Sequence, residues 1–187
     1  MPNWDAVYEA KDIASTCAAE VLIDYMDRLP ASGIALDYAC GLGGNSILLA
    51  RQGFNVVALD QSSVALTKLD KYAQHNNLSI KTQICDLEEN PPAYDAQFDV
   101  IVVSYFLHRK TLAELYGYLR KDGILVYQTF SGDQIEGKGP ASSDYRLRRG
   151  ELLKVFDKMQ LLYYREDIYR KNCQGPLSGQ VQFVARK

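Results

Sequence analysis

The stretch Leu36-Asp-Tyr-Ala-Cys-Gly-Leu-Gly-Gly-Asn45 decides the fold of this chain. An apolar run at 33–36 leads into it, and residues 45–50 follow it with apolar groups at helical spacing. A strand, a tight glycine turn and a helix are therefore predicted here. Glycines let the backbone come close to a ligand, and a helix N-terminus offers unpaired N–H groups, so the turn is typical of a nucleotide cradle.

Length and composition favour one globular domain that acts on a small molecule. The chain has 187 residues, of which 47% are hydrophobic and 24% charged, and its net charge is -2. This length suits a single domain, and the charge lacks the basic excess of nucleic-acid or anionic-membrane surfaces. We expect residues 1–187 to form one domain with no nucleic-acid partner and no membrane partner.

The sequence indicates neither export nor a metal site. No basic segment precedes an apolar core at the start, and the longest apolar stretch, 100–107, is far shorter than the ~20 residues that span a bilayer. The four cysteines, Cys17, Cys40, Cys85 and Cys173, lie far apart without a CxxC pair, so no zinc site and no disulfide framework is predicted. We expect a cytoplasmic protein, either a monomer or a homodimer.

Strand and helix patterns alternate along the chain. Residues 5–29 have apolar groups at helical spacing up to Pro30, which predicts a helical cover over residues 1–30. The run 98–104 is the most continuously apolar and is expected to be a central strand buried on both faces. Strands are predicted at 33–36, 54–60, 79–85, 98–104 and 124–130, and helices at 45–50, from Ser62 or Ser63 to 77, and at 111–120.

This alternation predicts a doubly wound, mostly parallel α/β sheet with helices on both faces. Residues 33–130 would form its ligand-binding core. Residues 131–187 would add a substrate-side loop at 131–144, a helix at 147–159 and two strands at 161–169 and 179–186. The last two strands are expected to form an antiparallel hairpin at the edge, which makes a seven-stranded sheet.

Acidic residues follow the first three strands, and ligands of such sheets bind at the carboxyl ends of strands. Asp60, after the second strand, suits both hydroxyls of an unphosphorylated ribose. The dinucleotide fingerprint G-x-G-x-x-G is imperfect, because its third glycine is displaced to Gly44. Asp37 would face a pyrophosphate at close range, so its charge favours a cationic ligand such as a sulfonium. The third acid is Asp86.

Four motifs in order make a family resemblance specific. They are the turn at 36–45, Val-Ala-Leu-Asp60-Gln-Ser, Cys85-Asp-Leu87, and Leu119-Arg-Lys-Asp-Gly-Ile-Leu125. Over residues 33–130 the chain resembles class I (Rossmann-like) S-adenosylmethionine-dependent methyltransferases.

Two further segments are similar to small bacterial members related to the tellurite-resistance and thiopurine methyltransferases. They are Trp4-Asp-x-x-Tyr8 and Leu147-Arg-Arg-Gly-Glu-Leu152. Relatives of the tellurite-resistance type tend to carry an arginine just before the tyrosine, where this chain has Val7. A role for that arginine in holding the methionine carboxylate or the substrate therefore does not transfer directly to this chain.

The resemblance implies S-adenosyl-L-methionine as the cofactor, S-adenosyl-L-homocysteine as the product and a small-molecule nucleophile as the methyl acceptor. It implies that Asp37 lies near the methionyl amino group, that Asp60 binds the ribose and that Asp86 and Leu87 hold the adenine. The residues expected at the cofactor are Asp37, Ala39, Cys40, Gly41, Gly43, Asn45, Asp60, Gln61, Ser62, Asp86, Leu87, Ser104, Tyr105 and Leu107.

Acceptor and catalytic residues are expected in the segments that the cofactor constrains least. His108 and Tyr8 are candidate general bases, although His108 could instead cap the next helix. Arginines near 146–149 either clamp an anionic substrate or form a solvated helix start, and Trp4 and Tyr8 either staple the N-terminal helix or close a lid. The acceptor candidates are Trp4, Tyr8, Tyr105, Arg109, Arg146 and Arg149.

Two other functions stay open from the sequence. One is a non-catalytic S-adenosylmethionine-binding protein of the same fold, which would serve as a sensor or assembly partner. The other is a nicotinamide-dependent oxidoreductase. Neither requires a different architecture, so the arrangement of the site has to discriminate between them.

Overall fold

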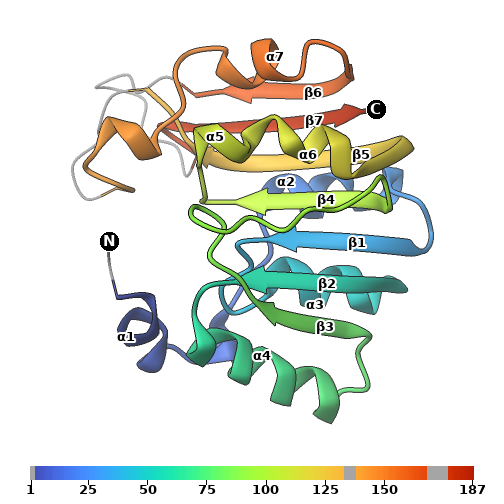
Figure 1. Ribbon diagram of the computed structural model, residues 1–187, viewed down its shortest axis with the longest axis vertical. Coiled ribbons are helices and arrows are strands. Elements are labelled where there is room, and N and C mark those ends of the chain that lie inside the picture. Colours follow the sequence, from blue (N-terminus) through green and yellow to red (C-terminus); the bar gives the residue numbers. More distant parts are fainter. Residues whose placement is uncertain (1–2, 133–137, 168–176) are drawn as a thin grey trace.

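One seven-stranded sheet forms the centre of the computed structural model, which describes residues 3–132, 138–167 and 177–187 (Figure 1). Its strands are β1 (Gly33–Tyr38), β2 (Phe54–Asp60), β3 (Ile80–Ile84), β4 (Phe98–Ser104), β5 (Leu119–Phe130), β6 (Gln160–Glu166) and β7 (Gln180–Arg186). They lie in the order β3-β2-β1-β4-β5-β7-β6. β1 to β5 pair in parallel, and β7 pairs antiparallel with β5 and β6. The predicted doubly wound, mostly parallel α/β fold is confirmed.

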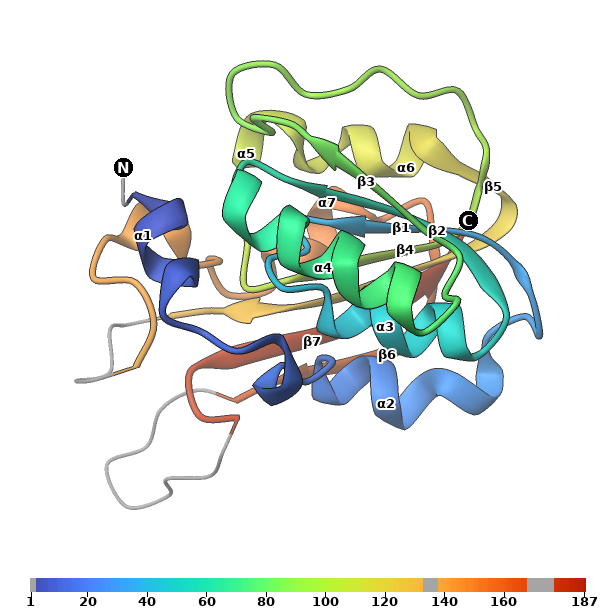
Figure 2. The ribbon, with the colours of Figure 1, turned by 90° about the horizontal axis from the view of Figure 1, so that it is seen from below.

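Helices lie on both faces of this sheet (Figure 2). They are α1 (Trp4–Glu9), α2 (Glu20–Tyr25), α3 (Gly44–Arg51), α4 (Ser63–His75), α5 (Arg109–Leu112), α6 (Glu114–Tyr118) and α7 (Glu151–Val155). Buried side chains of α2 and α3 pack on one face, and those of α5, α6 and α7 pack on the other. α4 packs beside α3 through a third buried cluster. None of these described helices is long and apolar enough to cross a membrane.

The central strand β4 is buried on both faces, as predicted. Val100 and Val102 join the cluster under α2 and α3, whereas Ile101 and Val103 join the cluster under α5 and α6. Successive residues of a strand point to opposite faces, so a strand covered on both sides needs a continuous apolar run. The apolar run therefore places the carboxyl end of β4, at Ser104, in the middle of the sheet edge.

The N-terminal helical cover is broken, which corrects the prediction over 5–29. α1 ends at Glu9, a 3-10 turn covers Ile13–Ser15, and α2 begins only at Glu20. The Asp12 carboxylate accepts a bond of 3.0 Å from the Ala14 N–H and starts the 3-10 turn. Residues 16–19 then pass over the glycine turn, where a Cβ at Gly44 would lie 2.2 Å from the Cys17 carbonyl oxygen. Close packing on the turn, rather than helix propensity, sets the path of this segment.

Two other helices are shorter than predicted. The helix expected at 111–120 is replaced by α5 and α6, and β5 already begins at Leu119. The helix expected at 147–159 is only α7, because Arg146 and Leu147 are extended and Leu147 forms a bridge with Ser131. That pairing ties the loop after β5 back to the strand end.

The predicted antiparallel pair of C-terminal strands is present, and the strand order places one of the two strands inside the sheet. β7 lies between β5 and β6, so six of its seven residues are buried and only β6 forms the sheet edge. The end of the predicted strand 161–169, Cys173 and the first part of the connection between the two strands lie outside the described residues.

Candidate active site

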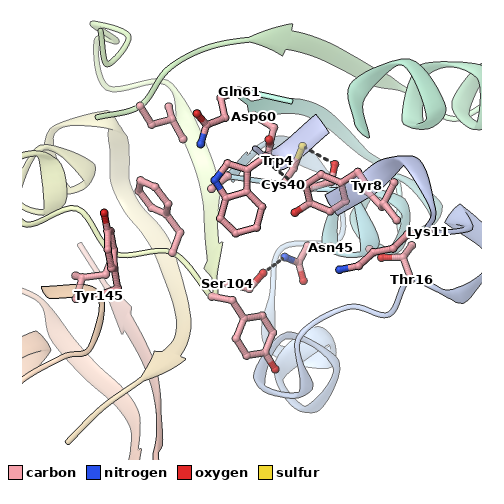
Figure 3. A pocket seen from close by; sticks show the side chains of 18 of the residues that line it. Trp4, Tyr8, Lys11, Thr16, Cys40, Asn45, Asp60, Gln61, Ser104 and Tyr145 are labelled. Atoms are coloured by element: carbon pink, nitrogen blue, oxygen red, sulfur yellow. Dashed lines mark hydrogen bonds between the residues drawn. The ribbon is translucent and has the colours of Figure 1, made fainter. Parts of the chain in front are cut away.

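A cleft of about 900 Å³ opens at the carboxyl ends of β1, β2, β3 and β4 (Figure 3). Its size is typical of small-molecule sites. α1 and the segment after it contribute Trp4, Tyr8, Lys11, Ser15, Thr16 and Cys17. The strand ends contribute Ala39, Cys40, Gly41, Leu42, Gly44, Asn45, Asp60, Gln61, Cys85, Asp86, Leu87, Glu88, Ser104, Tyr105, Phe106 and Leu107. The end of β5 and the loop after it contribute Phe130, Gly139, Pro140 and Tyr145.

The glycine turn after β1 shapes the floor of the cleft. Gly41 adopts a positive φ of 54°, and a Cβ on it would lie 2.6 Å from the Tyr8 hydroxyl. Gly43, at φ 78°, caps α3, and a Cβ there would overlap Leu69 of α4 at 2.5 Å. Gly41 therefore allows the Tyr8 hydroxyl to pack directly on the turn. Gly43 permits helix packing and does not line the cleft, which corrects its expected place at the ligand.

Asp37 lies behind the cleft wall, contrary to the expectation that it faces the ligand. Its side chain is fully buried and accepts hydrogen bonds from the Ser46 N–H at 2.9 Å, the Ser46 hydroxyl at 2.6 Å and Asn45 at 3.3 Å. Burial raises the pKa of this carboxyl to about 6. The carboxylate thus anchors the start of α3 to the end of β1, and the sequence argument that its charge selects a cationic ligand does not hold.

Asp60, unlike Asp37, lines the cleft. One carboxylate oxygen accepts a bond of 2.7 Å from the Gly41 N–H, and the other accepts a bond of 2.9 Å from the Ser62 N–H. Burial raises the pKa of Asp60. Each carboxylate oxygen has a further lone pair for a ligand hydroxyl. Ser62 itself is buried and caps α4 through the Ala65 N–H, so it supports Asp60 rather than lining the cleft.

The other expected cofactor residues converge as the strand order requires. The Asn45 amide donates to Ser104 Oγ at 2.9 Å and so joins the ends of β1 and β4. Asp86 Oδ1 accepts from the Glu88 and Glu89 N–H groups, so this acid both caps a turn and lines the cleft, beside Leu87. Ala39, Cys40, Gln61, Tyr105 and Leu107 are in the lining too.

α1 is held over the cleft by a polar clamp at each of its ends. Asp5 accepts from the Ser62 hydroxyl at 2.6 Å and from the Val64 N–H at 3.2 Å. Lys68 of α4 donates to three carbonyl oxygens at the other end, those of Tyr8 (2.8 Å), Glu9 (2.9 Å) and Lys11 (2.7 Å).

The helix held in this way carries Trp4 and Tyr8, whose rings stack at 6.0 Å between centroids. Burial and the Asp60 charge raise the pKa of Tyr8. Its phenol is therefore protonated at neutral pH and can donate a hydrogen bond, which argues against the expected role as a base.

His108 and the arginines do not line the cleft, which corrects their expected roles. His108 lies beside a small void on the other side of the loop after β4, with its Nδ1 3.1 Å from Thr111 Oγ1. Arg109 pairs with Glu151 at 2.7 Å, and Arg149 is exposed and outside the cleft lining.

Arg146 is 3% exposed, and its guanidinium donates to the carbonyl oxygens of Gly132, Ser131, Lys138 and Pro140. Arg109 also donates to the carbonyl oxygens of Asp144 and Arg146, at 2.6 and 2.7 Å. Both arginines hold the loop after β5 in place. Arg146 is therefore neither an anion clamp nor part of a solvated helix start.

Sequence reasoning missed the residues that close the two ends of the cleft. Lys11 and Thr16 lie on one side and Tyr145 on the opposite side in Figure 3. Phe106 and Phe130 complete the wall near Tyr145. Phe106 and Phe130 lie at or next to the ends of predicted strands, so their position in the sequence could have placed them at the cleft. Lys11 and Tyr145 reach the cleft only because segments distant in the sequence pack beside it.

Comparisons with known proteins agree with this fold and cleft. Residues 35–123 match the family model described as a methyltransferase domain. The chain is 33% identical over 146 residues to glycine/sarcosine N-methyltransferase of Aphanothece halophytica, covering 73% of this chain and 52% of that protein. It is 30% identical over 163 residues to the protein of the same name from Halorhodospira halochloris, covering 82% and 60%.

Among solved structures, TehB from Haemophilus influenzae superimposes with a TM-score of 0.73 at 18% identity, over 98% of this chain and 67% of that chain. This likeness shows a shared Rossmann-like α/β fold. The match of residues 35–123 to the methyltransferase-domain model supports the resemblance drawn from the sequence. The chain spans about half the length of the curated relatives that it matches.

Proposed function

We propose that this protein transfers a methyl group from S-adenosylmethionine to a small-molecule nucleophile. The observation that carries the proposal is the convergence of Asp60, Asp86 and the glycine turn at Gly41 on one cleft. These groups come from three different strand ends and match the needs of a ribose, an adenine and an aminoacyl chain. The relatives named glycine/sarcosine N-methyltransferase support a small-molecule acceptor.

We place the cofactor in the cleft in one orientation. Asp60 would accept from the ribose hydroxyls, and Asp86 with Leu87 would hold the adenine ring. The methionyl part would then extend past the glycine turn toward Asn45, beside the point where Tyr8 packs on Gly41. Because the lid residues Trp4 and Tyr8 lie over this path, the ligand would be enclosed between α1 and the sheet edge.

Lys11 would complete this arrangement as the partner of the methionyl carboxylate. Its ammonium lies 5.3 Å from the centroid of the Tyr8 ring, and its side chain lines the cleft beside Thr16. No arginine is among the described residues that line the cleft. Lys11 thus supplies the cation that Val7 does not, four positions further along the chain.

Bound S-adenosylmethionine supplies an electrophilic methyl group. The chain contributes position and exclusion of water, since an in-line displacement needs a nucleophile held about 3 Å from the methyl group. Tyr8 can donate a hydrogen bond but does not act as a base, because its phenol stays protonated. No histidine is found among the described lining residues, so an acceptor that loses a proton would release it to water or to a carboxylate such as Glu88.

Calorimetric titration with S-adenosylmethionine, S-adenosylhomocysteine and NAD tests the proposal. Tight binding of NAD without binding of either sulfur ligand would support an oxidoreductase and contradict methyl transfer. This test matters because the buried Asp37 no longer argues against a pyrophosphate. Formation of S-adenosylhomocysteine with a panel of amines, phenols, thiols and oxyanions then separates an enzyme from a sensor that only binds the cofactor.

The non-catalytic alternative is weakened by one feature of the cleft. Its walls extend beyond the residues assigned to the cofactor, to Phe130, Pro140 and Tyr145, and a protein that only binds the cofactor has no need of that extension. A cytoplasmic location, a monomeric or homodimeric state and the lack of a nucleic-acid partner stay predictions from the sequence.

A further inference from the structure

The part of the cleft outside the path proposed for the cofactor is lined mainly by aromatic rings. Trp4 comes from the lid, Tyr105 and Phe106 from the loop after β4, Phe130 from the end of β5 and Tyr145 from the loop beyond it. Tyr105 and Phe130 contact each other with ring centroids 5.5 Å apart. These rings come from four separate segments, so their convergence is a product of tertiary structure.

Hydrogen bonds and close packing hold the backbone that carries these aromatic rings. Tyr105 has a left-handed φ of 55°, and its N–H donates to the Gln128 carbonyl oxygen at 2.8 Å. A non-glycine residue keeps such a backbone only where its surroundings enforce it. On the other side, a Cβ at Gly139 would lie 2.5 Å from the Phe130 ring, so the loop packs directly on that ring. The backbone on both sides of Tyr145 is held, because Arg109 binds the Asp144 carbonyl oxygen and Arg146 is buried.

The charge around these rings is unsuited to an anion. The Arg146 guanidinium lies 5.6 Å from the centroid of the Phe130 ring, and it donates to loop carbonyl oxygens. Arg109 pairs with Glu151 and also donates to loop carbonyl oxygens. Among the described residues of the cleft, Lys11 is the single cation, and it lies on the side opposite Tyr145 (Figure 3). Glu88 lines the cleft, and Glu20 lies 3.5 Å from the Tyr105 hydroxyl. A carboxylate or an oxyanion would lose its hydration here without a cationic partner.

We propose that the methyl acceptor is a flat aromatic molecule that carries no negative charge, either neutral or an amine. Aromatic faces bind other rings by offset or edge contacts and attract cations, whereas a small carboxylate finds neither surface nor charge. The inference rests on the proposed function for the position of the methyl group. It departs from the glycine and sarcosine named for the relatives, both of which are carboxylates.

Binding of matched probes tests this inference without requiring turnover. Trp4 is the one tryptophan of the chain and lies in the cleft, so its fluorescence reports occupancy. Benzylamine, benzyl alcohol, benzoate and glycine would be titrated into the protein with and without S-adenosylhomocysteine. We expect the first two to bind at least about tenfold more tightly than benzoate or glycine. Equal binding, or a preference for benzoate or glycine, would overturn the inference.

Two variants at Tyr145 separate the ring from the hydroxyl. The side chain is 41% exposed, so neither substitution leaves a cavity in the core. Tyr145→Phe should keep the preference for the aromatic amine, and Tyr145→Ala should reduce affinity for benzylamine roughly fivefold or more. The same loss in Tyr145→Phe would mean that the hydroxyl, not the aromatic face, recognises the probe.

The outcomes distinguish this inference from the proposed function. Failure of S-adenosylhomocysteine and S-adenosylmethionine to bind, with the aromatic preference intact, would contradict methyl transfer and leave the aromatic site in place. Cofactor binding with transfer to glycine or to oxyanions would confirm methyl transfer and refute the aromatic acceptor.

Discussion

The ammonium group of Lys68, on α4, donates a hydrogen bond of 2.8 Å to the carbonyl oxygen of Tyr8, at the end of α1. The same ammonium also binds the carbonyl oxygens of Glu9 and Lys11. A cation at the C-terminus of a helix donates hydrogen bonds to the last carbonyl groups, and it interacts favourably with the negative end of the helix dipole. One side chain of the core fold thus holds the lid that carries Tyr8 over the glycine turn.

Lys68→Met is expected to loosen the lid while leaving the core folded. We expect the affinity for S-adenosylhomocysteine to fall roughly tenfold. A hydrogen bond from a charged group stabilises a structure by about 1.5–3 kcal/mol, and the variant loses this stabilisation of the lid. Calorimetry measures the affinity, and stopped-flow fluorescence of Trp4 should show faster release. Lys71→Met, at an exposed position of the same helix, is the matched control. Equal affinities in both variants would mean that the clamp does not act on the ligand.

Asp60→Asn should weaken cofactor binding by about tenfold or more, since a carboxylate that accepts from ribose hydroxyls is replaced by an amide with one acceptor. Because burial raises the pKa of Asp60, acidification should reduce affinity in the wild type and not in the variant. Calorimetric titrations across the acidic range measure both effects. The control is Asp70→Asn, which changes an acid that bonds Gln74 on the outer side of α4. Unchanged affinity in Asp60→Asn would refute the ribose assignment.

Lys11→Met is expected to weaken S-adenosylmethionine binding only by removing the contact between the Lys11 ammonium and the carboxylate of the cofactor. The matched ligand is decarboxylated S-adenosylmethionine, for which wild type and variant should bind alike, while Lys11→Arg should retain most of the affinity for the normal cofactor. A loss of roughly fivefold to thirtyfold is expected for one charge-assisted contact. A similar loss with the decarboxylated ligand would show that Lys11 acts on the lid rather than on the carboxylate.

Asp37→Asn should change how stability depends on pH. Burial raises the pKa of Asp37 from 3.8 to about 6, so the native state retains a proton that the unfolded chain releases. The stabilisation from this proton is complete below the unfolded pKa and is lost as the pH rises through about 6. Between about pH 4 and pH 7 the free energy of unfolding of the wild type should fall relative to the variant, by on the order of 3 kcal/mol. Urea unfolding at several pH values measures it, and a constant difference would contradict the assignment.

Arg109→Met should loosen the loop after β5 without weakening the cofactor site. Arg109 joins α5 to Glu151 and to two carbonyl oxygens of that loop, and we expect its loss to cost about 1–3 kcal/mol in the free energy of unfolding. Hydrogen exchange of the amides of residues 142–150 should accelerate. Arg149→Met, at an exposed position, is the control. Unchanged exchange would mean that Leu147 and Arg146 hold the loop without Arg109.

Local patterns in the sequence were enough to predict the sheet, the glycine turn and the acids at the sheet edge. Hydrophobic periodicity and turn residues are local signals, and parallel strands bring their carboxyl ends to one edge whatever the loops do. Asp60, Asp86 and Gly41 could therefore be assigned to one cleft from their positions in the chain. The same reasoning identified β4 as central, because a strand covered on both faces must be continuously apolar.

Which side chains line the cleft depends on tertiary contacts that local patterns do not contain. Asp37 follows a strand just as Asp60 does, yet it turns into the start of α3, where three donors satisfy it. Arg146 has the charge of an anion clamp but is buried among loop carbonyl oxygens, whereas Lys11 and Tyr145 reach the cleft from distant segments. Side-chain direction depends on hydrogen-bond partners and packing far along the chain, and residue type and local spacing do not encode these contacts.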